Sequence, residues 1–320
     1  MSAQASLKVA LAQMAPVWLE RERTLWKMTA WAQRAADADA GLCVFGEALL
    51  PGYPFWVELT DGARFEDDFQ KTLYAHYLEE AVNPEDDLAP LQELARDSRM
   101  VIALGCMERA SDRGGHSLYC SLVYIDASGE LQPVHRKLVP TYEERLVWAP
   151  GDGHGLRCHA LGAFTVGGLL CWENWMTLPR AALHNQGEDL HLALWPGNER
   201  NTAECTRFLA REGRSFVLSV SGLMRAEDLP EELPFADQLR PLLPAMSANG
   251  GSCIAGPDGR WLVEPVVGEE RLILAELDHA LVRRERQNFD PAGHYSRPDV
   301  LQLALDRRRQ GNLTVRGDDD

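Results

Sequence analysis

The chain has 320 residues, 45% of them hydrophobic, and its 48 acidic and 32 basic side chains give a formal net charge of -16. This length and apolar content are enough for a sizeable core. The acidic balance argues against nucleic acid as a partner and against an anionic membrane surface, because both would repel the chain.

The first half of the chain alternates strand-like and helix-like segments. Residues 1–6 lack a basic region leading into an apolar run, so we expect no signal peptide. Apolar, β-branched runs predict strands, and apolar residues at helical spacing predict helices. In chain order the predicted elements are a strand at 8–14, a helix at 20–38, a strand at 42–45, helices at 66–81 and 86–97, and strands at 100–105 and 117–125.

The same alternation continues in the second half. Gly167 and Gly168 lie within a predicted strand and suggest a close approach of another part of the chain. Pro179 early and Gly187 late frame the helix that follows. The other predicted elements are strands at 164–171, 190–195, 215–221, 252–255 and 272–277, and helices at 200–214 and 278–287.

This regular alternation predicts one α/β domain, residues 1–306, with helices on both faces of layered sheets. No apolar run is long enough to span a membrane. Residues 226–246 break the rhythm and are interpreted as an inserted loop, either a second subunit interface or a lid over the active site, since the loop is rich in leucine. Residues 307–320 form a polar tail that we expect to fray.

The seven cysteines are scattered without C-x-x-C spacing. Their odd number and spacing predict neither a disulfide framework nor a zinc site, and a reducing cytoplasm fits best. Most of them are interpreted as small buried hydrophobic residues. Cys171 differs because it ends an apolar strand and is followed by polar Glu173 and Asn174. A nucleophile is favoured at such a strand end, where backbone N–H groups can stabilise a thiolate.

Three charged residues follow or occupy other short strand-like segments. Glu47 comes after the strand at 42–45 and is a candidate base. Lys137 could stabilise the negative charge of a tetrahedral intermediate, and Glu144, seven residues later, is a third acid that could return to the same pocket. His135 is interpreted as a structural hydrogen-bonding residue, and no histidine pair has metal-ligand spacing.

Four segments together resemble the signature blocks of the nitrilase superfamily, and most closely those of its nitrilase branch. The resemblance preserves their order and spacing from about residue 7 to about residue 304. The segments are Phe45 to Pro54, His135 to Trp148, Leu170 to Met176, and Gly293 to Asp299.

The resemblance implies a four-layer α-β-β-α sandwich with Glu47, Lys137 and Cys171 as the catalytic triad and Glu144 as an additional acid. The backbone N–H of Trp172 would help to stabilise the developing anion. The expected activity is hydrolysis of a nitrile to a carboxylic acid and ammonia through a thioimidate and a thioester. The expected substrate-binding residues are Tyr53, Trp56, Trp148, Trp195 and Pro196.

No cofactor or metal is required for this chemistry. The family implies a homo-oligomer, a dimer that buries helices near Cys171 and can extend into a spiral. An amidase or carbamoylase of the same superfamily is the first alternative, because the same triad can open an amide. A non-catalytic assembly protein is the second, and the retention of Glu47, Lys137 and Cys171 argues against it. The nature of the nitrile stays open among aromatic, arylaliphatic and aliphatic compounds and cyanide.

Overall fold

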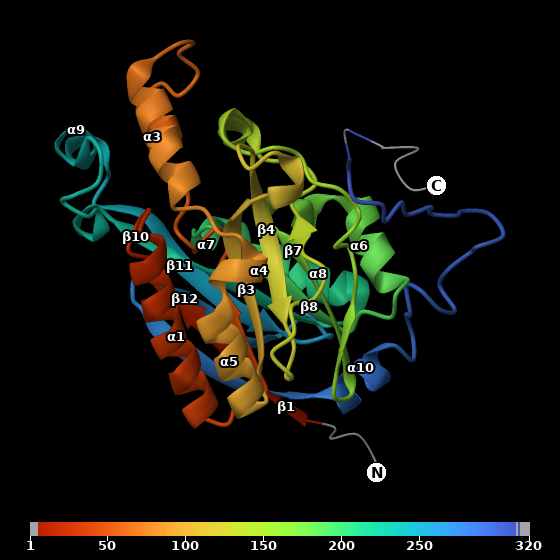
Figure 1. Cartoon of the computed structure of the whole chain (residues 1–320). Coiled ribbons are helices and arrows are strands. Elements are labelled where there is room, and N and C mark those ends of the chain that lie inside the picture. The colour runs from red at the N-terminus through yellow and green to blue at the C-terminus, as the bar shows by residue number, and fades with distance from the viewer. Residues whose placement is uncertain (1–5, 312, 314–320) are drawn as a thin grey trace, which may run out of the picture.

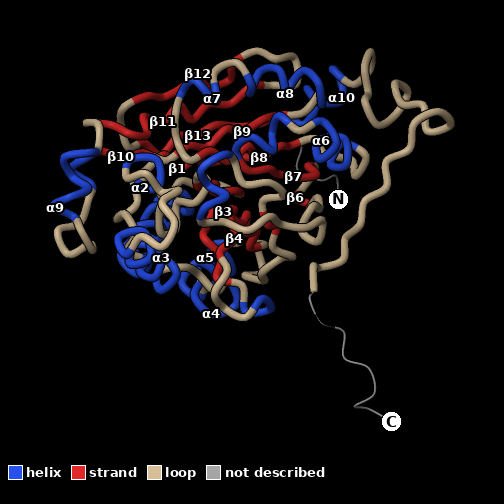
Figure 2. The backbone as a smooth tube through the Cα atoms, turned by 90° about the horizontal axis from the view of Figure 1, so that it is seen from above, coloured by secondary structure: helices blue, strands red, loops and turns tan. Residues whose placement is uncertain are grey.

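Two stacked β-sheets lie between helices in the computed structural model, which describes residues 6–311 and 313 (Figures 1 and 2). Residues 1–5, most of the N-terminal segment in which we expect no signal peptide, lie outside the described residues. Residues 312 and 314–320 of the predicted tail also lie outside them. In the part of the chain that the structure describes, no helix has the length and apolar character needed to cross a lipid bilayer.

The first sheet has the strand order β13-β1-β2-β3-β4-β5. Strands β1, β2 and β3 run parallel, and β13, β4 and β5 pair antiparallel with their neighbours. The strands are β1 (Ser6–Gln13), β2 (Leu42–Phe45), β3 (Val101–Arg109), β4 (Leu118–Ile125), β5 (His135–Arg136) and β13 (Arg271–Asp278).

The second sheet has the order β10-β11-β9-β8-β7-β6, and β12 pairs with β11. Its central strands β7, β8 and β9 are parallel. The strands are β6 (His159–Leu161), β7 (Phe164–Leu170), β8 (Leu190–Trp195), β9 (Phe216–Ser221), β10 (Leu223–Arg225), β11 (Met246–Ala255) and β12 (Trp261–Val267).

Helices α1 and α5 lie side by side over the first sheet, and α6 and α8 cover the second (Figure 1). The α-helices are α1 (Arg21–Asp37), α2 (Trp56–Leu59), α3 (Asp68–Glu79), α4 (Pro84–Asp87), α5 (Ala89–Ser98), α6 (Thr177–His184), α7 (Glu199–Thr202), α8 (Cys205–Gly213), α9 (Ala236–Leu239) and α10 (His279–Glu285). Short 3-10 helices include η2 (Tyr142–Leu146) and η3 (Cys171–Trp175).

The alternation of side chains along each strand explains the layering. In β1, Val9 and Leu11 join the core between the sheets, whereas Ala10 and Ala12 face the layer that contains α1. Successive side chains of a strand point to opposite faces, so a strand that is apolar throughout needs a layer on each side. The predicted α-β-β-α sandwich is confirmed.

Two predicted helices are each divided in the structure. The segment 86–97 becomes α4 and α5, because Pro90 lacks the N–H that a continuous helix would need there. The segment 200–214 becomes α7 and α8, and the hydroxyl of Thr202 at the end of α7 donates to Gly251 O in β11.

Strands β6, β10 and β12 were not predicted. Strands β6 and β10 have only three residues each. Strand β12 contains Pro265, pairs only with β11 among the described strands, and is half exposed, so its sequence lacks the continuous apolar run of a buried strand.

The predicted inserted loop is ordered against its own chain. Phe235 stacks on Phe69 of α3 with ring centroids 4.5 Å apart, and α9 stands next to α3 in Figure 1. Leu242 is the exception among the leucines of the loop, with 48% of its surface exposed. Its buried apolar side chains are those of Leu229, Leu233, Leu239 and Leu243.

The described start of the polar tail is held against the body rather than frayed. Arg309 pairs with Asp152 at 2.9 Å and donates to Val134 O, and the backbone N–H of Gln310 donates to Asp152. Gly153 leaves room for this crossing, since a Cβ there would lie 2.2 Å from Asp306 O.

Candidate active site

The predicted base lies where the two sheets meet. Glu47 follows β2, and its backbone N–H donates to Trp195 O, at the end of β8, over 3.1 Å. Gly105 of β3 passes so close that a Cβ would lie 2.5 Å from the Cα of Glu47. Main-chain packing therefore fixes the backbone position of Glu47 independently of its side-chain contacts.

Lys137 lies between two carboxylates. It follows β5, and its Nζ donates to Glu47 Oε1 at 2.8 Å and to Glu144 Oε2 at 2.7 Å. All three side chains are almost completely buried. A buried carboxylate needs a partner of opposite charge, and one lysine here serves two.

Glu144 is oriented by the turn that carries it. Thr141 and Glu144 form a capping box at the start of η2, in which the Thr141 N–H donates to Glu144 Oε2 at 2.6 Å. The hydroxyl of Tyr53 lies 3.1 Å from both Glu144 Oε1 and Glu143 Oε1. The predicted return of Glu144 to the pocket is present in the geometry.

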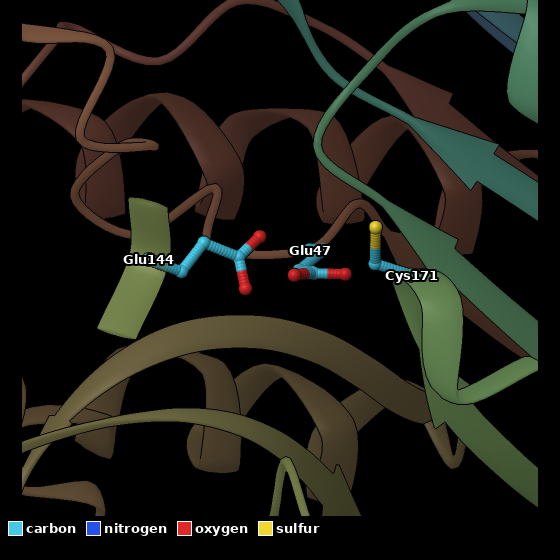
Figure 3. Close-up of side chains that lie close together, drawn as sticks. All are labelled: Glu47, Glu144 and Cys171. Carbon is cyan, nitrogen blue, oxygen red and sulfur yellow. The ribbon is translucent and has the colours of Figure 1, made fainter. Parts of the chain in front are cut away.

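Cys171 lies directly after β7 in a left-handed conformation, with φ of 45°. Residues other than glycine adopt this conformation at a cost and often at functional sites. The Cys171 sulfur and one carboxylate oxygen each of Glu47 and Glu144 all lie within 4.8 Å of one another, with Glu47 between the other two in Figure 3. The backbone N–H of Trp172 lowers the pKa of this thiol.

The carboxylate of Glu47 has one saturated and one open oxygen. Its Oε1 accepts from Lys137 and from the thiol of Cys120, whose sulfur is 3.5 Å away. Its Oε2 is buried and has no hydrogen-bond partner among residues 6–311 and 313. One oxygen is thus held, and the other is free to take a proton.

Burial raises the pKa values of both proton-exchanging groups. Burial raises the pKa of Glu47 to about 8, against the opposing effect of Lys137. Burial also raises the pKa of the Cys171 thiol well above its usual value, although Lys137 lowers it. The adjacent carboxylates and the thiol hold the pKa of Lys137 well above its usual value despite its burial. The resting site therefore favours a neutral thiol beside a carboxyl group that can exchange protons near neutral pH.

Glu47, Glu144 and Cys171 have the donor atoms of a metal site, but a cation already lies among them. The ammonium group of Lys137 contacts both carboxylates at hydrogen-bonding distance. A divalent ion would have to displace that charge, so the arrangement fits metal-independent chemistry.

Glu173 connects the segment that follows Lys137 to the turn that carries Cys171, a role that the sequence did not predict. Its Oε1 accepts from Leu138 N at 2.6 Å, and its Oε2 accepts from Leu170 N at 3.0 Å. His135 Nε2 lies 3.1 Å from Oε2, as the structural interpretation of this histidine predicts. Burial would raise the pKa of Glu173, but His135 and these N–H donors hold it below its usual value. The sequence signal that could have found it is a polar residue two places after Cys171.

The aromatic residues expected to bind substrate lie in different places. Tyr53 and Trp148 are in edge-to-face contact beside the site, and Lys137 Nζ is 5.3 Å from the Trp148 ring centroid. Trp56 is buried against Tyr77. The Trp195 side chain faces the layer that contains α8.

Two further predicted residues lie nearer the surface. Pro196 is half-buried. The Trp172 side chain is 45% exposed and lines an open cleft of about 380 Å³ with Tyr142 and Arg145. The contribution of Trp172 to the site comes from its backbone N–H, which lowers the pKa of the Cys171 thiol.

The chain is similar to known proteins of one enzyme family. Residues 8–287 match the model of the carbon–nitrogen hydrolase family. The chain is 35% identical to a nitrilase 2 from an unknown prokaryotic organism, over 97% of this chain and 95% of the relative. It is 35% identical to an aliphatic nitrilase of Rhodococcus rhodochrous (94% and 80% covered) and 36% identical to a nitrilase of Pseudomonas syringae pv. syringae (93% and 89% covered).

Solved structures share the fold at lower identity. A carbon–nitrogen hydrolase from Helicobacter pylori G27 superimposes with a TM-score of 0.69 at 18% identity, covering 92% of this chain and 96% of that one. An amidase of the nitrilase superfamily from Nesterenkonia AN1 gives a TM-score of 0.65 at 18% identity (90% and 97% covered). With the family match and the curated relatives, these findings show that the chain belongs to the carbon–nitrogen hydrolase family, in its nitrilase branch.

Proposed function

We propose that this protein is a nitrilase that hydrolyses a small organic nitrile to a carboxylic acid and ammonia, with Cys171 as nucleophile. The observation that supports it most is the open Oε2 of Glu47, on a buried carboxylate whose other oxygen is fixed by Lys137. The similarity to relatives named nitrilase supports the choice of a nitrile as substrate.

The first half of the reaction forms a thioimidate. The Cys171 sulfur adds to the nitrile carbon, Glu47 takes the thiol proton, and that proton passes to the nitrile nitrogen. Lys137 and the Trp172 N–H stabilise the negative charge that develops on nitrogen. The pKa of Glu47, raised to about 8 by burial, suits a group that alternates as base and acid.

The second half consumes two waters. The first, deprotonated by Glu47, adds to the thioimidate carbon, and the protonated nitrogen leaves as ammonia to give a thioester. The second adds to the thioester carbon, the carbon–sulfur bond breaks, and the acid leaves as the thiol regains its proton. Covalent catalysis divides a slow hydration into steps that a single base can serve. Glu144, which shares Lys137 with Glu47, is the proposed additional acid that holds the lysine in place.

Ammonia release from matched substrates tests this proposal. Benzonitrile, phenylacetonitrile, mandelonitrile and an aliphatic dinitrile are compared with their amides, using wild type and Cys171→Ala. We expect acid and ammonia from at least one nitrile, little free amide, and no turnover by the variant. Preference for the amide in every pair would instead identify the amidase or carbamoylase alternative.

The proposed assembly is a homodimer, with further extension into a spiral, formed through the face that carries α6 and α8. Trp172 stacks on Trp175, and this pair is about half exposed. Trp175 and the exposed Phe208 line one cleft, and the exposed Leu178 lies in the first turn of α6, three residues after Trp175. Exposed apolar side chains gathered on one face are typical of an interface. Light scattering should give at least a dimer for wild type and a smaller species for Leu178→Asp.

A reducing cytoplasm remains the proposed compartment. All seven cysteines, each within the described part of the chain, are free thiols.

A further inference from the structure

A buried carboxamide supports the nucleophile turn from the side of the second sheet. Asn174 is fully buried, and its Nδ2 donates to Cys171 O at 2.8 Å and to Leu169 O at 3.3 Å. Two carbonyl acceptors on one side fix the amide nitrogen there, so the Oδ1 of Asn174 faces the other way. Nothing in the proposed chemistry has so far used this residue.

A histidine and a glutamate continue the contact into the sheet. His191 Nε2 of β8 lies 2.7 Å from Asn174 Oδ1, and His191 Nδ1 lies 2.7 Å from Glu188 Oε1. Both side chains are buried. Gly167 of β7 makes room for Glu188, because a Cβ there would lie 2.2 Å from its Oε1. The close approach that the sequence predicted at Gly167 is thus explained.

The order of donors and acceptors determines where protons lie. Asn174 Oδ1 can only accept, so His191 Nε2 carries a hydrogen. His191 Nδ1 faces a carboxylate oxygen at hydrogen-bonding distance, so a second proton lies between His191 and Glu188. Whether His191 or Glu188 holds that proton, Asn174 accepts a hydrogen bond from the His191 ring, which is itself hydrogen-bonded to Glu188.

This series of hydrogen bonds ends at the peptide group between Cys171 and Trp172. The carbonyl of Cys171, which accepts from Asn174, and the N–H of Trp172 belong to the same peptide unit. Hydrogen bonds in series polarise one another, and a carbonyl that accepts a bond makes the N–H of its own peptide a stronger donor. The contact also fixes the plane of that peptide.

We propose that Glu188, His191 and Asn174 are positioning residues that orient and polarise the Cys171–Trp172 peptide, so that the Trp172 N–H stabilises the anion formed when the thiol adds to substrate. This inference rests on the proposed hydrolase function and extends it beyond the triad. It assigns a purpose to a buried histidine that contacts neither the thiol nor the carboxylates around Lys137.

The neighbouring histidine supplies a matched control. His184 Nε2 of α6 lies 4.0 Å from Glu188 Oε2, and within the described part of the chain His184 makes no hydrogen bond to Asn174. His184→Gln therefore perturbs the same glutamate without reaching the nucleophile turn. His191→Gln keeps a neutral donor near Nε2, and His191→Leu removes it.

Two reactions of Cys171 separate anion stabilisation from general damage. Acylation by p-nitrophenyl acetate passes through an oxyanion, whereas alkylation by iodoacetamide displaces iodide and forms no anion on the reagent. Loss of a direct oxyanion donor costs about 100-fold or more in rate, so loss of its support should cost about tenfold. We expect His191→Leu to lower both nitrile kcat and acylation by about that factor, with His191→Gln intermediate. The nitrile KM should stay within about twofold, and alkylation should fall much less than acylation.

Several outcomes would overturn the proposal. One is an equal loss in acylation and alkylation; another is an equal effect of His191→Gln and His184→Gln on their ratio. If His191→Leu does not fold, the comparison of His191→Gln with His184→Gln tests the proposal instead. A wild type that is acylated but hydrolyses no nitrile refutes the proposed function alone, and the acylation ratio still tests the chain of positioning residues. A wild type not acylated at Cys171 refutes both.

Discussion

The two sides of Cys171 are built from different chemistry. On the side of the first sheet, Glu47, Lys137 and Glu144 form a charged cluster in which one carboxylate oxygen of Glu47 has no partner among the described residues. On the side of the second sheet, the Asn174 carboxamide is saturated by two carbonyls and by His191. A group that transfers protons needs an oxygen without a hydrogen-bond partner and a pKa near neutrality. A group that orients a backbone needs hydrogen bonds on both its donor and its acceptor side.

The largest expected loss comes from removing the cation of the charged side. Lys137→Met leaves two buried carboxylates facing each other and removes a charge that stabilises the developing anion, so kcat should fall by about a thousandfold or more. Breaking such a buried pair also costs about 3–5 kcal/mol of stability. Steady-state kinetics and calorimetry measure both, with Lys71→Met, an exposed lysine paired with Glu66, as control. Near-normal turnover by Lys137→Met would remove the lysine from the mechanism.

Glu144 should matter less than Lys137. Glu144→Gln keeps the side-chain shape but removes the negative charge that faces Lys137, and we expect kcat to fall by about tenfold to a hundredfold. Glu143→Gln is the matched control, because Glu143 meets only the Tyr53 hydroxyl of this site. Equal activities for the two variants would leave Glu144 a structural role in its capping box.

The charged side was easier to predict from the sequence than the neutral side. Glu47, Lys137 and Cys171 each follow a strand, and their residue types carry recognisable chemistry. His191 lies within a fully buried strand, where a histidine suggests only a satisfied polar group. Asn174 is brought to it by the parallel pairing of β7 and β8, which sequence spacing does not reveal, whereas Glu188 lies only three residues before it. Strand β12 was missed for a related reason, since tertiary pairing overrides the weak local signal around Pro265.

The raised pKa of Glu47 predicts a pH dependence of both rate and stability. The base must be ionised, so kcat/KM should rise as the pH approaches about 8, the pKa to which burial raises this carboxyl. The folded state binds this proton more tightly than the unfolded state, whose carboxyl has the ordinary value of 4.5. The resulting stabilisation is complete below the ordinary value and is lost as the pH rises through about 8.

Thermal unfolding of wild type and Glu47→Gln between these pH values measures that loss. The melting temperature of wild type should fall relative to that of the variant as the pH rises. The Lys137 ammonium stays protonated throughout this range, because its pKa is raised further above its already high usual value. A difference that is constant with pH would show that Glu47 titrates normally.

The smallest expected effect concerns the second thiol of the charged side. Cys120→Val removes a weak S–H donor to Glu47 Oε1, while Cys120→Ser keeps a donor there. A single neutral hydrogen bond contributes about 1 kcal/mol, so we expect kcat to fall by up to about fivefold for Val and less for Ser. Cys106→Val, in a buried cysteine of the adjacent strand β3, is the control. A greater loss for Ser than for Val would contradict a donor role.

The most direct test of the central claim is mass spectrometry of the protein quenched in acid while it turns over a nitrile. We expect an acyl or imidoyl adduct on the peptide that contains Cys171. The Cys171→Ala variant should show neither the adduct nor any ammonia release. Ammonia release without an adduct at Cys171, or continued turnover by Cys171→Ala, would contradict it.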